Sequence, residues 1–342
     1  MPTETCLRAS VVIPAYNAAG TLPACLAALS QQTLTPTSFE IIVADDGSTD
    51  DTAREAGRAG ATRVLMLPHR GPAAARNAGI AAARGEVILF TDADCQPAPE
   101  WLAQMLQPLD DPSVVGVKGS YQTRQREVVA RLAQCEFEER YNRQARLPSI
   151  DFVDSYAAAF RSGVLREAGG FNPAFPRADN EDVDLSYRLA ERGCHLVFNR
   201  LAVVYHGHVA TWRGYARLKA RRGYWRMAVY RMHPGKALRD SYTPQILKLQ
   251  VLLVYLALGL ALLSFLWAPL LWGTLASMAA LLLSAWPFTK LVARLDRPVT
   301  PWAPWFVVLR AGAFAAGIAA GVGATLLGRP ALRSSGPRAG EG

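Results

Sequence analysis

The sequence predicts an α/β protein whose mostly parallel sheet carries helices on both faces and is followed by transmembrane helices. In the first half, short apolar segments alternate with helical patterns, which is the order of parallel strands and their crossover helices. Nearer the C-terminal end, the 41 residues Leu249–Thr289 contain no charged side chain. One bilayer crossing needs about 20 apolar residues, so this stretch is long enough for two crossings.

The alternation can be followed along the chain from the first apolar run. We expect strands at residues 10–16, 40–46, 63–68 and 86–92. Helical patterns follow these strands at residues 21–32, 50–59, 72–85 and 99–109. The middle of the chain is more mixed, with strands expected at residues 116–121, 152–161 and 194–199, helices at 126–144 and 181–193, and a further apolar run at 202–208.

Polar clusters stand at the ends of three of the expected strands. They are Pro14–Asn17, Asp45–Asp50 and Asp92–Asp94. Ligands of open parallel sheets bind at the carboxyl ends of the strands. The three clusters therefore predict a single site.

Composition and charge favour a membrane surface as the partner of this chain. The net charge is +9, the hydrophobic fraction is 51% and the mean hydropathy is +0.09. Residues 210–239 contain nine Lys and Arg residues and no acid. A basic block directly before an apolar stretch is typical of a segment that contacts anionic lipid headgroups. The same block could bind nucleic acid, but the adjacent apolar stretch argues against a nucleic-acid partner.

The cysteines and the first residues indicate a reducing compartment. The five cysteines are scattered and none forms a Cys-x-x-Cys pair, so neither a zinc site nor a disulfide framework is indicated. The stretch MPTETCLRAS has no basic-then-apolar signal pattern. We therefore expect the N-terminal domain to remain in the cytosol.

The C-terminal region is expected to cross the inner or plasma membrane more than once. Residues 248–289 predict two transmembrane helices that turn near Trp267–Pro269. Lys248 and Lys290 bracket them and place both ends on the cytosolic side. Residues 305–328 predict a third span, and residues 329–342 a disordered tail.

Four segments, in this order, resemble glycosyltransferase family 2. They are SVVIPAYN, FEIIVADDGSTDDT, GPAAARNAGIAAARGEVILFTDAD and NEDVDLSYRLAERG. The resemblance covers about residues 9–208 and implies the GT-A fold and inverting sugar transfer from a nucleotide-sugar. It divides the chain into a GT-A domain at 1–208, with a nucleotide-sugar half at 1–118 and an acceptor half at 119–208. A basic amphipathic juxtamembrane segment follows at 209–247.

Asp92 and Asp94 form the Asp-x-Asp pair of the fourth expected strand. Two carboxylates beside a diphosphate repel it unless a hard cation bridges them, and Mg²⁺ and Mn²⁺ prefer such oxygen ligands. The resemblance implies that Asp94 holds the metal and that Asp92 contacts the ribose. The alternative is a solvated turn that caps the helix near Pro97–Glu100.

The resemblance also implies a set of nucleotide contacts. The residues expected to bind the nucleotide-sugar are Pro14, Ala15, Tyr16, Asp45, Asp46 and Arg76, together with Asp92. Asp45 would contact the base, and Arg76, paired with Asn77, would reach the nucleotide. The alternatives are structural: ADDGSTDDT is also a passable turn and helix cap, and a lone Arg on a helix usually faces solvent.

Glu181 and Asp182 open a helix that follows Asn180. Acids favour a helix N-terminus on electrostatic grounds alone, which is the structural alternative. Inverting transfer needs one base near the acceptor hydroxyl, and the resemblance implies Asp182 as that base with Glu181 in support. His206 and His208 fall where a family histidine can contact the metal or diphosphate, and either could serve or be purely structural.

Together these observations predict a membrane-anchored, metal-dependent inverting glycosyltransferase. It would move a sugar, expected to come from a UDP-sugar, to a hydroxyl of a lipid or glycan acceptor. One alternative acceptor is a polyprenyl phosphate, and a less favoured reading is a binding protein without catalysis. The family's processive synthases carry Gln-x-x-Arg-Trp, whereas Arg221–Trp225 lacks the Gln and the Arg, which disfavours a polymerase.

Overall fold

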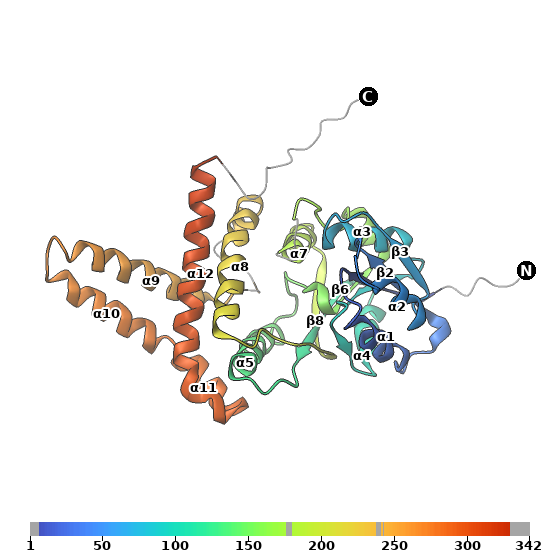
Figure 1. The fold of residues 1–342 in the computed structure, drawn as a ribbon, viewed down its shortest axis with the longest axis horizontal. Coiled ribbons are helices and arrows are strands. Elements are labelled where there is room, and N and C mark those ends of the chain that lie inside the picture. Colours follow the sequence, from blue (N-terminus) through green and yellow to red (C-terminus); the bar gives the residue numbers. More distant parts are fainter. Residues whose placement is uncertain (1–6, 176–179, 237–240, 242, 329–342) are drawn as a thin grey trace, which may run out of the picture. The chain divides into compact units, whose positions relative to one another are not determined.

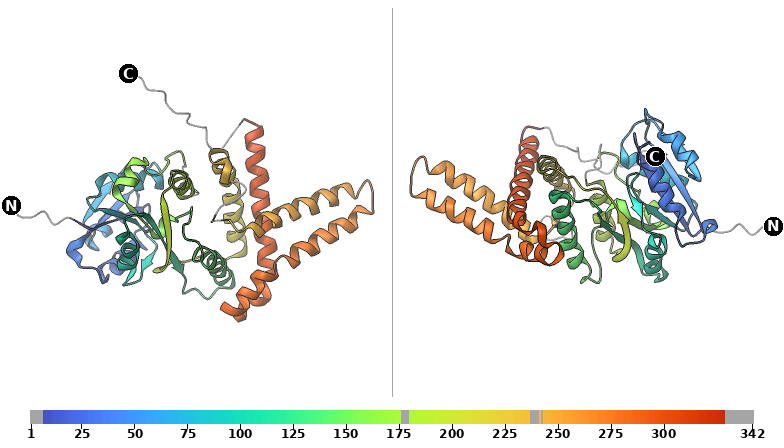
Figure 2. Two further views of the ribbon diagram at one scale, coloured as in Figure 1. Left: turned by 180° about the vertical axis from the view of Figure 1, so that it is seen from behind. Right: turned by 60° about the horizontal axis from the view of Figure 1, so that its bottom comes forward.

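The computed structural model describes residues 7–175, 180–236, 241 and 243–328, which form two compact units. The N-terminal unit covers residues 1–209 and the C-terminal unit residues 210–342. Figures 1 and 2 show that the first unit contains the sheet and that the second is built of helices.

The N-terminal unit is organised around one eight-stranded sheet of order β3-β2-β1-β4-β7-β6-β8-β5. Its strands are β1 (Ala9–Ala15), β2 (Phe39–Asp45), β3 (Arg63–Met66), β4 (Val87–Phe90), β5 (Gln96–Pro97), β6 (Val114–Gln122), β7 (Ala158–Arg161) and β8 (His195–Tyr205). The first four are parallel, as are β6 and β8, whereas β7 runs antiparallel to β4 and β6, and β5 runs antiparallel to β8. The predicted α/β class and the mostly parallel sheet are confirmed.

Strand alternation builds a core on each face of this sheet. Along β1, Val11 and Ile13 enter one buried cluster and Val12 enters the other, because successive strand side chains point to opposite faces. Both faces are buried, so the central strands are apolar throughout.

Helices cover both faces. One face packs against α1 (Leu22–Ser30), α2 (Thr52–Arg58), α4 (Trp101–Leu106) and α5 (Val128–Gln144). The other packs against α3 (Pro72–Ala82), α6 (Ser162–Glu167) and α7 (Glu181–Glu191). This is the predicted arrangement of helices on both faces.

Some elements differ from the sequence prediction. The apolar runs at 194–199 and 202–208 belong mainly to one long strand, β8, whose pairing with β6 is interrupted by register shifts. The expected strand at 152–161 is extended only from Ala158, after a short 3₁₀ turn. The two-residue strand β5 and the helix α6 were not predicted, because each is too short to show a hydrophobic period.

The C-terminal unit contains five α-helices among its described residues. They are α8 (Trp212–Met232), α9 (Gln245–Leu263), α10 (Leu270–Leu283), α11 (Trp286–Leu295) and α12 (Ala303–Leu326). Three helical segments are long and apolar enough to cross a membrane: Gln245–Leu263, Leu270–Leu295 and Arg297–Leu326. α9 and α10 form a hairpin (Figure 1). The tail predicted to be disordered, residues 329–342, lies outside the described residues.

The basic segment before the apolar helices forms α8, which packs along α12. Glycines permit this contact: a Cβ on Gly317 would lie 1.9 Å from the carbonyl oxygen of Ala220, and one on Gly223 would lie 2.5 Å from that of Phe314. Two of its cationic side chains, Lys219 and Arg226, are buried. The expected contact of this segment with lipid headgroups stays a prediction.

Candidate active site

A cavity of about 720 Å³ opens at the carboxyl ends of β1, β2 and β4. This is the edge at which the sequence placed its three polar clusters. Its lining residues are Pro14, Ala15, Tyr16, Asn17, Ala18, Thr21, Asp46, His69, Gly71, Pro72, Ala75, Arg76, Asp92, Ala93 and Asp94. Seven of the predicted site residues are among them.

One end of the cavity pairs an aromatic surface with a carboxylate. Asp46 accepts hydrogen bonds from the backbone amides of Arg70 and Gly71, both at 2.8 Å. His69 Nδ1 lies 3.0 Å from Asp46 Oδ2, and the His69 ring stacks on Tyr16 with centroids 4.2 Å apart. Gly71 stands at the turn before α3 with a φ of 91°, a backbone conformation that glycine adopts without strain. His69 was missed by sequence reasoning, and no motif marks it.

Asp45 is placed differently from its neighbour Asp46. Its carboxylate accepts hydrogen bonds from the amide (3.0 Å) and the hydroxyl (2.5 Å) of Ser48, and it is absent from the lining of this cavity. Asp45 therefore holds the turn after β2, as the structural reading of ADDGST expects, while Asp46 faces the cavity.

Arg76 joins the two acidic motifs. Its buried guanidinium donates to Glu181 Oε1 at 2.7 Å and to Asp92 Oδ1 at 3.0 Å. Burial alone would lower the pKa of Arg76, but the neighbouring charges of Asp92 and Glu181 outweigh it and raise the pKa. Asn77, its neighbour in sequence, instead exchanges two hydrogen bonds with the backbone of Phe171.

Glu181 and Asp182 begin α7 behind Arg76. Burial raises the pKa of Glu181 despite its bond to Arg76. Burial, followed by the charges of Glu181 and Asp154, raises the pKa of Asp182 to about 7. Asp182 Oδ2 is 3.4 Å from the amide of Ser155. Neither acid lines the 720 Å³ cavity. Glu181 bonds Arg76, which does line the cavity, and Asp182 interacts with Glu181 through its charge.

A second buried charge pair supports this region. Lys118 Nζ, in the middle of β6, is 2.5 Å from Asp154 Oδ2, and Arg140 lies 3.7 Å from the other oxygen of Asp154. Burial lowers the pKa of Lys118 to about 8. Sequence reasoning missed this pair, although a lysine inside the apolar strand GVKGSY was a usable signal, because a buried lysine needs a partner.

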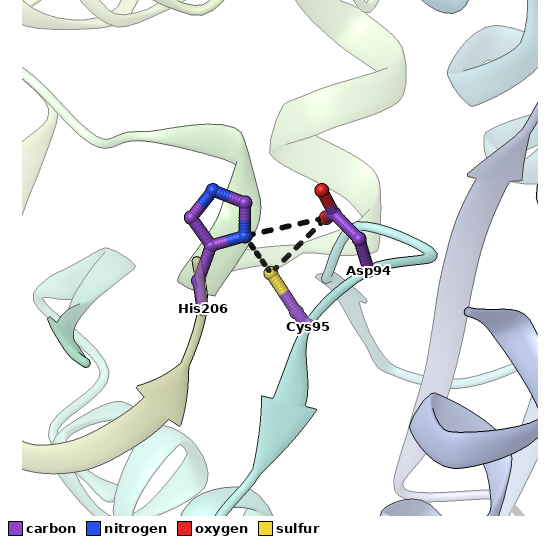
Figure 3. A group of neighbouring side chains, drawn as sticks. All are labelled: Asp94, Cys95 and His206. Carbon is purple, nitrogen blue, oxygen red and sulfur yellow. Dashed lines mark hydrogen bonds and ion pairs between the residues drawn. The ribbon is translucent and has the colours of Figure 1, made fainter. Parts of the chain in front are cut away.

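The third group of side chains is Asp94, Cys95 and His206 (Figure 3). His206 Nδ1 is 3.4 Å from Asp94 Oδ1, and Cys95 Sγ lies 3.8 Å from the same carboxylate and 3.9 Å from Nδ1. Burial alone would lower the pKa of His206, but its hydrogen bond to Asp94 raises the pKa. Burial raises the pKa of the Cys95 thiol well above its usual value.

The two candidate histidines lie near each other but make different contacts. His206 faces Asp94, whereas His208 Nε2 contacts the side chain of Gln134 at 2.9 Å and its ring stacks on Phe137. The pairing of β5 with β8 brings the first group together, since Gln96 opposes Tyr205 and the next antiparallel pair is Cys95 and His206. Cys95 and His206 are 111 residues apart in the chain, so no local sequence pattern predicts their contact.

The fold and the site can now be compared with known proteins. The model of the family "Glycosyl transferase family 2" matches residues 10–169, which contain Asp46, Arg76, Asp92 and Asp94. Residues 10–169 of this chain form a domain of glycosyltransferase family 2. The predicted family membership is confirmed.

Individual relatives agree with this assignment. Over 238 residues this chain is 31% identical to the pre-mycofactocin glycosyltransferase of Mycobacterium tuberculosis. The match covers 66% of this chain and 48% of that protein. It is also 34% identical over 111 residues to an undecaprenyl-phosphate 4-deoxy-4-formamido-L-arabinose transferase of Klebsiella pneumoniae, covering 30% and 34% of the two chains. The chain thus spans about half the length of the first relative and about a third of the length of the second.

A solved structure shows the same fold. The mannosyltransferase PcManGT from Pyrobaculum calidifontis, in complex with GDP-Man and Mn²⁺, matches with a TM-score of 0.58 and 23% identity. The match covers 90% of this chain and 86% of that one. The predicted GT-A fold is confirmed by this likeness.

Proposed function

We propose that this protein is a membrane-anchored glycosyltransferase that uses a nucleotide-sugar donor and a divalent cation. One observation carries the proposal: a 720 Å³ cavity beside the family 2 motifs is lined by Tyr16 and Asp46 and also by the Asp92–Asp94 pair. A nucleoside fits the first two residues, and a diphosphate the second two.

The donor would lie across the strand ends. Asp46 is oriented by two backbone amides and has His69 beside it, and the remaining lone pairs of its carboxylate would accept from the imide or amino edge of a base that packs beside Tyr16. Pro14 and Ala15 would contact the base through their backbone. Arg76 orients Asp92 toward the ribose and remains bonded to Glu181. Asp45 would support this end through the turn.

The residues around Asp94 fit a divalent cation. The Asp94 side chain is 52% exposed, lines the cavity and has His206 Nδ1 at 3.4 Å. Carboxylate oxygens suit Mn²⁺ and Mg²⁺, and PcManGT was solved with Mn²⁺. When bound, such a cation supplies charge stabilisation for the departing nucleoside diphosphate. His208 hydrogen-bonds to the side chain of Gln134 and has no part in this proposal.

Asp182 is the proposed base. Its pKa, raised to about 7 by burial and by its acidic neighbours, lets it accept a proton from an acceptor hydroxyl near neutral pH. The oxygen of that hydroxyl then attacks the anomeric carbon opposite the leaving diphosphate, and the configuration inverts. Glu181 holds Arg76 through an ion pair, and its charge helps to raise the pKa of Asp182.

The acceptor is proposed to be a hydroxyl of a lipid or glycan at the membrane. The three apolar helical segments support a location at the bilayer. A polyprenyl phosphate is the second candidate, because one relative is named as an undecaprenyl-phosphate transferase. The two differ in their need for a base, since a phosphate oxygen is already ionised at neutral pH.

Release of nucleoside diphosphate tests the proposal. Full-length protein in lipid nanodiscs would be given Mn²⁺, a panel of UDP-, GDP- and TDP-sugars, and either a membrane-lipid extract or undecaprenyl phosphate. Asp94→Asn and Asp182→Asn are the test variants, and Asp111→Asn, an exposed acid outside the site, is the matched control.

The expected result is acceptor-dependent release from one donor. Asp182→Asn should lower kcat by about 10²- to 10⁴-fold with a hydroxyl acceptor and much less with a phosphate acceptor. Asp94→Asn should abolish release with both, and Asp111→Asn should leave it unchanged. Donor binding without release of nucleoside diphosphate under all conditions would overturn the proposal that the protein is a catalyst. Equal rates for Asp182→Asn and the parent protein on a hydroxyl acceptor would overturn the assignment of Asp182 as the base.

A further inference from the structure

Asp94, Cys95 and His206 present three different donor atoms to one point. Figure 3 shows His206 Nδ1 directed at both the carboxylate of Asp94 and the sulfur of Cys95. All three donor atoms lie within 4.8 Å of one another. The divalent cation proposed for sugar transfer prefers oxygen ligands, so the sulfur of Cys95 has no part in the proposed function.

The separations match those around a small tetrahedral metal ion. With metal–ligand bonds of about 2.0–2.3 Å, neighbouring ligands in a tetrahedron are about 3.3–3.8 Å apart. The three observed separations are 3.4, 3.8 and 3.9 Å. Shifts of a few tenths of an ångström would therefore bring all three donor atoms to bonding distance of one ion. Cys95 Sγ also lies 3.8 Å from the hydroxyl of Tyr121.

The surrounding structure holds the triangle in place. Cys95 is completely buried, directly before β5, whose pairing with β8 fixes its position relative to His206. The ring of Tyr121 stacks on that of His206 with centroids 4.8 Å apart and sets the direction of the imidazole. Rigid support of this kind is what raises metal affinity.

The fourth position faces open space. Asp94 lines the 720 Å³ cavity and also, together with His206, a second cavity of about 280 Å³. A cation held by the three side chains could therefore be reached by water or by an anion from these cavities. Three protein ligands with an open fourth position are typical of an accessible zinc-type site.

We propose that Asp94, Cys95 and His206 form an inhibitory site for a thiophilic divalent cation of the Zn²⁺ class. On binding, the Cys95 thiol releases its proton to water and its sulfur becomes a ligand beside the carboxylate and the imidazole. Mg²⁺ and Mn²⁺ prefer oxygen and leave the thiol protonated. Because Asp94 is shared, the two kinds of cation compete, a consequence that rests on the proposed function.

Co²⁺ is the probe, because a thiolate ligand gives it a sulfur-to-cobalt charge-transfer band in the near ultraviolet. Full-length protein in nanodiscs would be titrated with Co²⁺, and bound Co²⁺ displaced with Zn²⁺. The variants are Cys95→Ser, Cys95→Ala and His206→Gln. Cys25→Ser is the matched control, since Cys25 is equally buried and its sulfur donates to the backbone oxygen of Asp92, but among the described residues it does not belong to the cluster of Asp94, Cys95 and His206.

The parent protein and Cys25→Ser should show the band, and Zn²⁺ should remove it. Both Cys95 variants should lose it, and Co²⁺ affinity should fall by at least about 10- to 100-fold. His206→Gln should keep a weaker-binding site that still has the band. Absence of the band in the parent, or its persistence in the Cys95 variants, would overturn the site.

Activity gives a second, separable readout. With Mn²⁺ present, Zn²⁺ should inhibit diphosphate release by the parent and have at least about tenfold less effect on Cys95→Ser. Equal inhibition of both proteins would overturn the inhibitory role. The cobalt spectrum needs no turnover, so a protein that binds Co²⁺ through sulfur but transfers no sugar would refute the proposed function and leave the site intact.

Discussion

At the scale of single residues, Arg76 is the charge that connects the site. Glu181 is only 2% exposed and would be costly to ionise without a partner. Arg76 supplies that partner and at the same time orients Asp92 from the opposite side. Since a guanidinium offers two donor nitrogens in a fixed plane, a lysine could not make both bonds with the same geometry.

Arg76→Met should therefore destabilise the protein. Removing one member of a buried ion pair leaves a buried carboxylate without its counter-charge, a loss of about 3–5 kcal/mol. Pulse proteolysis of the full chain in urea would measure the free energy of unfolding. The double variant Arg76→Met, Glu181→Gln should regain part of the loss, and equal stability of the single variant and the parent would contradict the ion pair.

The acid limb of the activity profile should come from Asp182. Because the base must be ionised, kcat/KM should fall as the pH drops below about 7, the raised pKa of Asp182. The charge of Asp154 helps to raise that pKa, so Asp154→Asn should move the limb to lower pH. Steady-state rates with a hydroxyl acceptor between pH 5 and 9 would check this. Below the pKa, kcat/KM should fall roughly tenfold for each pH unit.

The control for this profile is the exposed Asp111→Asn, which should not move the limb. His206 also titrates near the site, with its pKa raised by Asp94 against the effect of burial. Asp154→Asn leaves His206 untouched, so a limb that stays in place in this variant would assign the acid limb to His206 and refute Asp182 as its source.

At the scale of elements, close contact between α8 and α12 depends on glycine. At Gly317 the backbone of Ala220 is so near that a Cβ would lie 1.9 Å from its oxygen. Main-chain atoms of a helix cannot rotate aside as a side chain can. The two helices would have to separate, and packing along their whole contact would suffer.

Gly317→Ala should lower the stability of the helical unit by about 1–3 kcal/mol. The matched control is Gly312→Ala on the same helix, where the added carbon meets no atom within 4 Å beyond its own helix backbone among the described residues. That change should be neutral or slightly stabilising, because alanine favours a helix. Thermal unfolding of the full chain in detergent would compare them, and equal transition temperatures would show that α8 and α12 are not in close contact.

At the scale of the whole molecule, the three apolar segments should keep the protein in the membrane. Large apolar side chains of α9 and α10, including Leu258, Leu262 and Trp272, are exposed among the described residues, which is unfavourable in water but not in lipid. Alkaline carbonate should leave the full-length protein in the membrane pellet, and detergent should release it. Release by carbonate alone would mean that the apolar helices do not span the bilayer.

Much of the fold could be predicted from local patterns. Strands β1 to β4 and the helices between them follow from apolar runs and helical periods, and the apolar segments follow from their length without charge. β5 and α6 could not be predicted, because two and six residues carry no period. The antiparallel β7 was also out of reach, since strand direction depends on the path of the chain and not on residue type.

The candidate site divides in a similar way. Tyr16, Asp46, Arg76, Asp92 and Asp94 could be named because they stand at strand ends or in family motifs, and they do line one cavity. The turn role of Asp45 was one of two readings of a local motif, since its partner Ser48 is three residues away, and Lys118 was marked by its place in an apolar strand. The choice of His206 over His208 and the contributions of His69 and Cys95 could not be predicted, because each depends on a partner that is distant in the chain.

By itself the sequence determined the residue types at the strand ends, the periods of the main helices, the apolar C-terminal segments and membership of the family. Only the tertiary structure decided which of these side chains meet. Arg76 bonds Glu181 across 105 residues, and Cys95 reaches His206 across 111. The physical reason is that hydrophobic burial acts through local periodicity, whereas ion pairs and metal-ligand clusters form wherever strand order and register bring polar atoms within about 3–4 Å.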